Sequence, residues 1–259
     1  MNKTLNSKYA IVRGVAGTYD KCVKPGARKQ EIDVELAIEQ HNAYCAILEN
    51  MGLELMKIPA DGRFPDCCFA EDPGIIFGQK AVISRMKTAS RAGETTSIKK
   101  ALSIHKKIFE IRAPGTIDGG DVLKAGNRVY IGLSKRTNLS AIRQVESFIS
   151  KDGYEIIPVK IRNTLHLKTV CTHIGNNCMV IAPGHFDDGI FADYDIIRVP
   201  KNESYSANCL AINGKVIIPR GFPKTKALIE NKGFKTIQAG MSEFEKGGGS
   251  LTCLSIVYN

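Results

Sequence analysis

Pairs of apolar segments separated by short turns of Gly or Asn recur along the chain. Each pair has an apolar arm, a turn such as AGN, GNN or NG, and a second arm rich in Val and Ile. This pattern predicts β-hairpins, because Asn and Gly accept the backbone angles of tight turns. Four hairpins are predicted, at residues 74–84, 121–133, 173–184 and 208–221.

Segments with helical periodicity alternate with these hairpins. Residues 28–51 place apolar side chains at every third or fourth position, and Gly52 follows as a helix stop. Further helices are predicted at 94–109, 138–151, 223–232 and, as a short one, 187–194. About five helices therefore accompany about five hairpin-like units, at spacings of roughly 35–50 residues.

Repeats of this length predict a solenoid or a propeller-like array. The chain has 259 residues and no disordered linker, so we expect one closed α/β domain that spans 1–259. Two Rossmann-like halves are the alternative, but no GxGxxG motif follows a predicted strand.

The composition is that of a soluble globular protein, with 43% hydrophobic and 24% charged residues. No run approaches the roughly 18 apolar residues of a membrane-spanning helix. The first residues, MNKTLNSKYAIVRG, lack the apolar stretch of a secretory signal. We therefore predict no membrane partner and a cytoplasmic location.

The formal net charge is +10, which favours anionic surroundings in general. The basic residues are scattered, Trp is absent and aromatic residues make up 7% of the chain. A nucleic-acid binder clusters its charge and adds aromatic side chains that stack on bases. We therefore predict a solvated basic surface and no nucleic-acid partner.

The eight cysteines form no CxxC motif, and the five histidines form no HExxH motif. Neither a zinc ribbon nor a thioredoxin-like site is therefore indicated, and we predict no metal. In a cytoplasmic chain the cysteines should be free thiols, most of them in the core.

The segment EKGGGSLTC, residues 245–253, brings a run of glycines to Cys253 near the end of the sequence. Residues Leu251 to Tyr258 are apolar and β-branched, which predicts a buried strand. The glycines could form a loose loop before that strand, with Cys253 as a small core residue. The alternative is that they allow the backbone to approach a ligand closely.

The segment FPDCCFAEDPG holds Asp66, Glu71 and Asp72 between apolar neighbours. An acidic cluster in a basic protein is either a solvated turn or a site for a cation. The apolar flanks place the carboxylates on or beside buried strands, where charge is costly unless it is paired or meets a ligand.

The segment TIDGGDVL places Asp118 and Asp121 on either side of a Gly pair, which indicates a bulged edge strand or a close backbone approach. His166 lies between two leucines, where it could be an ordinary core histidine. Cysteine catalysis needs a thiolate, a nearby acid or base, and a group that orients it. Cys253, His166 and one carboxylate meet that need.

The motifs DCCFAED, TIDGGDVL, VYIGLSKRTN, TLHLKT, ANC and MSEFEKGGGSLTC occur in this order. Together they resemble the dimethylarginine dimethylaminohydrolase family, from YAIVRGV at residue 9 to the last predicted strand. That family belongs to the guanidino-modifying enzymes. The resemblance therefore implies a five-bladed α/β propeller of ββαβ-type repeats around a central active-site channel.

The resemblance also implies a role for each matching residue. Cys253 matches the nucleophile, His166 the general acid/base, and Asp118 the carboxylate that orients the histidine. The substrate-binding residues are Asp72 with Glu71 at the guanidinium, Asp66 near the α-ammonium, Arg91 and Arg136 at the α-carboxylate, and the backbone of Gly247 at the α-ammonium. The GGGS run contains more glycine than the family's loop.

In the mechanism that this resemblance implies, the Cys253 thiolate attacks the guanidinium carbon, and a covalent thiouronium is then hydrolysed to citrulline without a cofactor. Related deiminases and amidinotransferases carry an acid two residues after the histidine, where this chain has Lys168. A methylated nitrogen donates fewer hydrogen bonds, so the lysine favours Nω-methylated arginine over arginine.

Other functions stay open at this point. Arginine deiminase or amidinotransferase activity, on arginine or another Nω-substituted arginine, is the enzymatic alternative. A non-enzymatic arginine-binding or thiol-sensing protein is the alternative from another class. The expected partner is a small methylated arginine, and a homodimer is compatible with the sequence.

Overall fold

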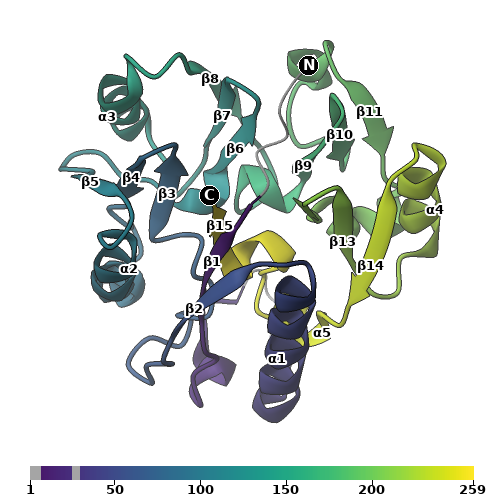
Figure 1. Cartoon of the computed structure of the whole chain (residues 1–259), viewed down its shortest axis with the longest axis horizontal. Helices are drawn as coiled ribbons and strands as arrows, with labels where there is room; N and C mark the ends of the chain where they lie inside the picture. The colour runs from purple at the N-terminus through teal and green to yellow at the C-terminus, as the bar shows by residue number, and fades with distance from the viewer. Residues whose placement is uncertain (1–6, 25–29) are drawn as a thin grey trace.

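The computed structural model describes residues 7–24 and 30–259. Within these residues the strands form five three-stranded sheets. The sheets are arranged around a common axis, and the helices α1 to α4 lie toward the periphery (Figure 1). The predicted five-bladed α/β propeller is therefore confirmed.

Each sheet combines three strands with one helical segment, and the bounds are as follows. The first sheet contains β1 Tyr9–Arg13, α1 Val34–Asn50, β2 Glu54–Ile58 and β15 Ser255–Tyr258. The second contains β3 Gly74–Phe77, β4 Lys80–Ile83, α2 Thr95–Leu102 and β5 Lys107–Glu110. The third contains β6 Val122–Ala125, β7 Arg128–Leu133, α3 Leu139–Ile149 and β8 Glu155–Lys160. The fourth contains β9 Cys171–Gly175, β10 Cys178–Ile181, the 3₁₀ helix Asp188–Phe191 and β11 Asp195–Arg198. The fifth contains β12 Leu210–Ile212, β13 Lys215–Pro219, α4 Pro223–Asn231 and β14 Lys235–Ala239, and α5 Ser242–Lys246 follows it. Other 3₁₀ helices lie at Tyr19–Lys21, Ala89–Glu94, Gly119–Asp121, Lys201–Ala207, Leu167–Thr169 and Leu251–Leu254.

The repeating unit is a hairpin followed by a helical crossover to a parallel strand. In the third sheet, β6 pairs with β7 in antiparallel register, and β8 pairs with β7 in parallel register. A parallel pair needs a long crossover connection, which α3 supplies here. The hairpin turns use the expected residues, since Asn213 has a φ of 48° and Gly214 a φ of 79°.

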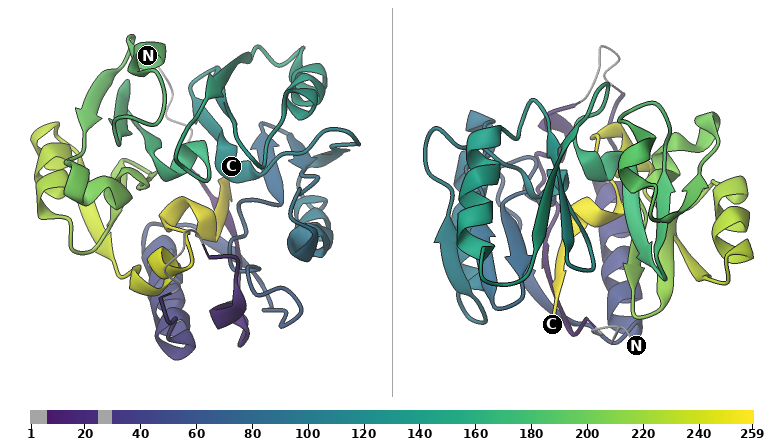
Figure 2. Two further views of the ribbon diagram at one scale, coloured as in Figure 1. Left: turned by 180° about the vertical axis from the view of Figure 1, so that it is seen from behind. Right: turned by 90° about the horizontal axis from the view of Figure 1, so that it is seen from above.

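The first sheet is built from both ends of the described chain. Its central strand β1 pairs with β15 in antiparallel register, from Tyr9↔Tyr258 onward, and with β2 in parallel register. The C-terminal segment therefore lies near the middle of the molecule in both further views (Figure 2). This closure places the chain just before β15 at the axis of the ring.

All four predicted hairpins are present, but two helix predictions were too long. The helix predicted at 94–109 ends at Leu102, because Lys107–Glu110 pairs with β4 as strand β5. The helix predicted at 28–51 begins at Val34, because Asp33 caps it by accepting a hydrogen bond from Leu36 N at 3.0 Å. Residues 28 and 29 of that prediction lie outside the described residues. The short helix near 187–194 is a 3₁₀ helix.

The innermost strands β3, β6, β9, β12 and β15 surround the central channel. A cavity of about 220 Å³ is lined by residues from all five, among them Ile75, Leu123, Thr172, Ala211 and Ile256. A second cavity, of about 20 Å³, shares no lining residue with the first and is lined mainly by loop residues. Within the described ranges, no helix has the length and hydrophobicity needed to cross a bilayer.

Candidate active site

The smaller cavity collects most of the predicted site residues. Its lining includes Asp72, His166 and Cys253, each from a segment that leads into one of the inner strands, together with Asp66, Arg91, Arg136 and Gly247. Asp118 does not line the cavity, but it lies directly behind His166. Of the predicted residues, Glu71 alone faces the larger cavity instead.

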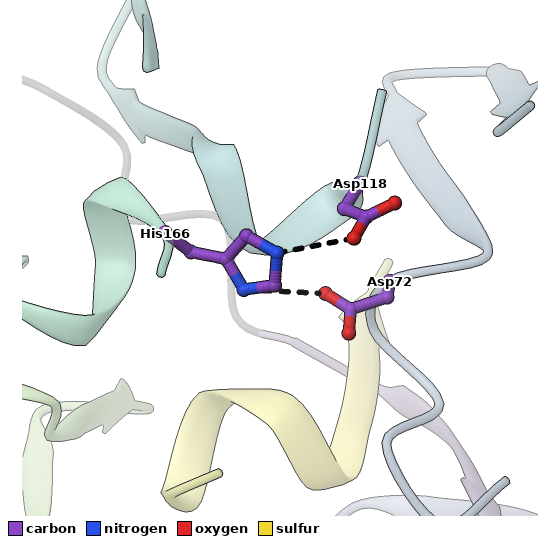
Figure 3. Close-up of side chains that lie close together, drawn as sticks. All are labelled: Asp72, Asp118 and His166. Atoms are coloured by element: carbon purple, nitrogen blue, oxygen red, sulfur yellow. Dashed lines mark hydrogen bonds and ion pairs between the residues drawn. The ribbon is translucent and has the colours of Figure 1, made fainter. Parts of the chain in front are cut away.

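His166 is held between two carboxylates (Figure 3). Its Nε2 lies 3.1 Å from Asp118 Oδ2, and its Nδ1 lies 3.9 Å from Asp72 Oδ1. Burial disfavours the charged ring, but the charge of Asp72 and the hydrogen bond to Asp118 outweigh it and raise the pKa of His166 to about 9. The ring is therefore protonated at neutral pH and can act as an acid.

Two glycines allow this close packing. A Cβ atom at Gly119 would lie 2.1 Å from the carbonyl oxygen of Glu71. A Cβ atom at Gly120 would lie 2.6 Å from His166 Nδ1, and the Gly120 N–H donates to Asp72 Oδ1 at 3.1 Å. The close backbone approach predicted from the Gly pair is present, within a 3₁₀ turn and not a bulged strand.

Cys253 lies in the 3₁₀ helix Leu251–Leu254, so the prediction that residues 251–258 form one strand was wrong for its first half. The turn is closed by Ser250, whose carbonyl accepts from Cys253 N at 3.0 Å and whose N–H donates to Cys253 Sγ at 3.4 Å. This turn directs the side chain of Cys253 into the smaller cavity. Burial, together with the charges of Glu71 and Asp72, raises the pKa of the Cys253 thiol to about 12.

The glycine run before Cys253 is a packed segment and not a loose loop. Gly247 ends α5, and a Cβ atom there would lie 2.3 Å from Tyr19 Oη. A Cβ atom at Gly249 would lie 2.1 Å from the ring of Phe69, and the Gly249 N–H donates to Phe244 O at 2.9 Å. The glycines are therefore required by contacts on one side, while they line the cavity on the other.

Arg91 is buried beside Asp72. Its Nη1 donates to Asp72 Oδ2 at 2.7 Å, and its Nε and Nη2 donate to Glu94 at 2.8–3.2 Å. Glu94 is 1% exposed and was not singled out from the sequence, although its position three residues after Arg91 is a typical spacing for an ion pair on a helical turn. Glu94 therefore fixes the direction in which Arg91 points.

Asp72 is a carboxylate that stays ionised although it is buried. Burial alone would raise its pKa, but the positive charges of His166 and Arg91 and the Gly120 N–H lower it to about 2. An ionised carboxylate in a buried cavity suits a cationic guanidinium, to which it can accept charge-assisted hydrogen bonds.

The remaining polar groups line the same cavity. Asp66 accepts hydrogen bonds from Val23 N at 3.2 Å, and burial raises its pKa. The Nη1 of Arg136 contacts Thr88 Oγ1 and lies 3.6 Å from Asp118 Oδ2. An anionic and a cationic group therefore stand close together, as an α-amino acid requires of its binding site.

Glu71 and Lys168 form an ion pair that faces away from this cavity. Lys168 Nζ contacts Glu71 Oε1, whereas Glu71 Oε2 has no hydrogen-bond partner within the described residues. Burial raises the pKa of Glu71 to about 7, and the charge of Lys168 offsets this only in part. This placement does not support the prediction that Glu71 joins Asp72 at the guanidinium.

Ligand atoms of Asp72, Asp118 and His166 lie within 4.8 Å of one another, as the donors of a metal site would. Two of these residues already share a hydrogen bond through His166 Nε2, and Asp72 accepts one from Gly120. This bonding suits a histidine that holds and transfers a proton. These contacts are compatible with proton transfer by His166.

Comparisons with known proteins agree with this geometry. The sequence profile of the family described as "N,N dimethylarginine dimethylhydrolase, eukaryotic" matches residues 15–257. The N(G),N(G)-dimethylarginine dimethylaminohydrolase of Pseudomonas aeruginosa is 37% identical over 226 residues, which cover 86% of this chain and 89% of the relative. The enzyme of the same name from Streptomyces coelicolor is 29% identical over 256 residues and covers 96% of each chain.

Solved structures show the same fold. A cysteine-to-serine variant of the Pseudomonas aeruginosa protein, complexed with citrulline, superposes with a TM-score of 0.93 at 33% identity, over 98% of this chain and 100% of the other. The N-terminal domain of a cyanobacterial arginine dihydrolase superposes with a TM-score of 0.90, but at 18% identity it shares the fold alone. Because the family profile matches residues 15–257 and the Pseudomonas aeruginosa enzyme is 37% identical, this chain belongs to the dimethylarginine dimethylaminohydrolase family.

Proposed function

We propose that this protein hydrolyses Nω-methylated L-arginine, as asymmetric dimethylarginine or monomethylarginine, to L-citrulline and dimethylamine or methylamine. The observation that carries the proposal is the smaller cavity, where Cys253, the protonated His166 and the ionised Asp72 meet. The names of the relatives support it, since those proteins are dimethylarginine dimethylaminohydrolases.

Substrate binding would use opposite charges at two places in the cavity. Asp72 would accept hydrogen bonds from the guanidinium, while Arg91 and Arg136 hold the α-carboxylate, and Asp66 and the backbone at Gly247 receive the α-ammonium. The cavity of about 20 Å³ holds about one water molecule, so its lining must move apart before an amino acid can enter. A guanidinium that reaches Asp72 would compete with Arg91 for the same carboxylate.

The reaction would begin with ionisation of the thiol. Without substrate, burial and the charges of Glu71 and Asp72 keep the Cys253 thiol neutral. A cationic guanidinium beside Asp72 would stabilise the thiolate, and the thiol proton would pass to solvent. The thiolate sulfur then bonds to the guanidinium carbon, and the tetrahedral adduct is held against Asp72.

His166 would complete both half-reactions. Its imidazolium gives a proton to the methylated nitrogen as the carbon–nitrogen bond breaks, and the neutral amine leaves behind a thiouronium on Cys253. The imidazole then takes a proton from water, whose oxygen bonds to the same carbon. The hydroxyl proton of the adduct passes to solvent as the carbon–sulfur bond breaks, which releases citrulline and restores the thiolate. Asp118 orients the ring and stabilises its charged form throughout.

Lys168 supports selectivity for methylated arginine. It pairs with Glu71 on the side of the larger cavity, so no second acid is supplied from this position to the guanidinium. We propose that one face of the guanidinium meets Asp72 and that the methylated nitrogen occupies the side without an acid. Arginine, which presents unsubstituted nitrogens on both sides, would gain less from this site.

The test compares products from arginine, monomethylarginine and asymmetric dimethylarginine. We expect methylamine or dimethylamine, with the highest kcat/KM on a methylated substrate. Ammonia and citrulline formed fastest from arginine would establish a deiminase, and amidino transfer to an added amine that outpaces hydrolysis would establish an amidinotransferase. Binding without turnover would favour the arginine-binding or thiol-sensing protein.

The substitution Lys168→Asp sharpens this test. It should raise activity on arginine relative to dimethylarginine, because it adds an acid at the position used by deiminases. An unchanged ratio of the two kcat/KM values would show that this position does not set specificity. The single domain over 1–259, the homodimer, the lack of a nucleic-acid partner and the cytoplasmic location stay predictions.

A further inference from the structure

A further buried carboxylate, Asp121, joins two loops of the candidate site. Its Oδ2 accepts hydrogen bonds from Ser134 Oγ and Thr137 Oγ1, each at 2.6 Å, and its Oδ1 accepts one from Leu167 N at 3.0 Å. The side chain is 0% exposed, and it forms no ion pair with a lysine or arginine of the described ranges. Three donors thus replace a cationic partner, which a buried carboxylate otherwise needs.

The first loop carries Arg136. Ser134 Oγ, which donates to Asp121, also accepts from the backbone N–H groups of Arg136 at 2.9 Å and Thr137 at 3.0 Å. Asp121 therefore fixes the turn from which the Arg136 side chain projects into the cavity. Gly132 leaves room for the carboxylate of Asp121, since a Cβ atom at Gly132 would lie 2.8 Å from Asp121 Oδ1.

The second loop carries His166. Leu167, whose N–H donates to Asp121, directly follows His166 and begins the 3₁₀ turn Leu167–Thr169. Thr137 Oγ1, which donates to Asp121, also accepts from the N–H of Asp118 at 3.3 Å. One carboxylate thus connects the histidine, the residue that orients it and the loop of Arg136.

We propose that Asp121 is a positioning residue that holds the His166 loop and the Arg136 loop in a fixed relation across the cavity. The inference rests on the proposed function only for the roles of His166 and Arg136 in turnover. It predicts that loss of Asp121 affects two steps at once, substrate affinity through Arg136 and the chemical step through His166. A carboxylate needed only for folding would change neither once the protein is folded.

The test uses Asp121→Asn, which keeps the shape of the side chain and removes its charge. The asparagine cannot accept from all three donors, because one of its two terminal atoms is an N–H₂ group. We expect kcat/KM to fall about tenfold to a hundredfold, from both a lower kcat and a higher KM, since charge-assisted hydrogen bonds are lost.

A second readout does not depend on turnover. The charges that act on His166 come from Asp72, Asp118 and Asp121, and together they raise its pKa to about 9. Removal of the Asp121 charge should therefore move the pKa of His166 down toward 6.5, its ordinary value. An NMR titration of the ring in substrate-free protein measures this shift even if methylarginine is not the substrate.

Glu203→Gln is the matched control. Glu203 is also a buried carboxylate, 5% exposed, which accepts from Lys224 N at 3.2 Å and Thr225 N at 2.7 Å, and it lines neither cavity. It should lower stability while kcat, KM and the pKa of His166 stay at their wild-type values. If Asp121→Asn does not fold, Thr137→Val, which deletes one donor to Asp121, should change the same three quantities by less.

The outcomes separate the two proposals. Wild-type protein that releases no amine from methylarginine overturns the proposed function, while the His166 titration still tests the positioning role. Wild-type kinetics and an unchanged pKa of His166 in folded Asp121→Asn overturn the positioning role. So does a loss of activity that merely follows stability and that Glu203→Gln reproduces.

Discussion

The two cavities of the channel differ although three segments of the chain contribute side chains to both. Asp72, His166 and Cys253 line the smaller cavity, whereas Glu71, Lys168 and Thr252, each one or two positions away, line the larger one. The neighbours Glu71 and Asp72 show the contrast most clearly, because the pKa of the first is raised to about 7 and that of the second is lowered to about 2.

The difference follows from the number of partners. Asp72 is buried and Glu71 is partly buried, and the loss of contact with water by itself raises the pKa of a carboxylate. Asp72 meets two cations, Arg91 and His166, and a backbone N–H. Glu71 meets Lys168, and its second oxygen has no hydrogen-bond partner within the described residues. The effect of burial on the pKa is therefore larger than that of ion pairing at Glu71, and smaller at Asp72. As a result, the pKa values of these two adjacent carboxyl groups shift in opposite directions.

The largest effect should separate Cys253 from its neighbour Thr252. Cys253→Ser should lower kcat by about a thousandfold or more, because the serine hydroxyl is not ionised and cannot replace the thiolate. Thr252→Ser, on the side of the larger cavity, should retain most activity. Mass spectrometry of acid-quenched wild-type protein should show an adduct on Cys253. An active Cys253→Ser variant would contradict the assignment of the nucleophile.

A smaller effect should separate the two carboxylates. Asp72→Asn should lower kcat/KM about a hundredfold or more, because it removes the charge that faces both the guanidinium and His166. Glu71→Gln keeps the shape of the opposite side and should cost no more than about tenfold. Steady-state kinetics on asymmetric dimethylarginine measure both. Equal losses of kcat/KM in the two variants would show that Glu71 contributes to turnover as much as Asp72 does.

The smallest expected effect concerns how the free energy of unfolding depends on pH. Glu71 should make the protein less stable as pH rises, whereas Asp72 should make it more stable as pH rises. The folded-state pKa of Glu71 lies above its ordinary 4.5, so its contribution to stability is present below pH 4.5 and is lost as pH rises to about 7. The folded-state pKa of Asp72 lies below its ordinary 3.8, so its contribution is present above pH 3.8 and is lost as pH falls to about 2.

Urea unfolding of wild type, Glu71→Gln and Asp72→Asn over pH 2–7 measures these contributions. The free energy of unfolding of wild type minus that of Glu71→Gln should decline as pH rises from about 4.5 to 7. The free energy of unfolding of wild type minus that of Asp72→Asn should grow as pH rises from about 2 to 3.8. Differences that do not change with pH in these windows would contradict the opposite shifts.

Local turn chemistry explains which parts of the fold could be predicted from the sequence. The hairpins follow from Asn and Gly residues that accept positive φ angles, such as Asn213 and Gly214. The strand Lys107–Glu110 could not be separated from the preceding helix, because its strand conformation depends on parallel pairing with β4. The same limit applies to Leu251–Leu254, where the contacts of Ser250 produce a turn in an apolar segment.

Residue types and the family resemblance together predicted which residues belong to the candidate site, but not how each of their side chains is oriented. Cys253, His166 and Asp118 were predicted in this way, and the structure brings them together. The sequence could not distinguish the directions of the Glu71 and Asp72 side chains. In a turn, the side to which each residue points depends on the backbone conformation, which the sequence alone does not specify. The role of Glu94 depends on hydrogen bonds that residue order alone does not specify.

The pairing of β1 with β15 has a consequence for the order of folding. Sheets two to five are formed from neighbouring segments, whereas this pair joins positions separated by almost the whole chain, from Tyr9 to Tyr258. Closure of so long a loop carries the largest entropic cost in the ring and tends to occur late. Because Cys253 lies two residues before β15, the nucleophile should reach its position only when the other blades have formed. The recovery of activity should therefore lag behind the recovery of strand structure when the protein refolds.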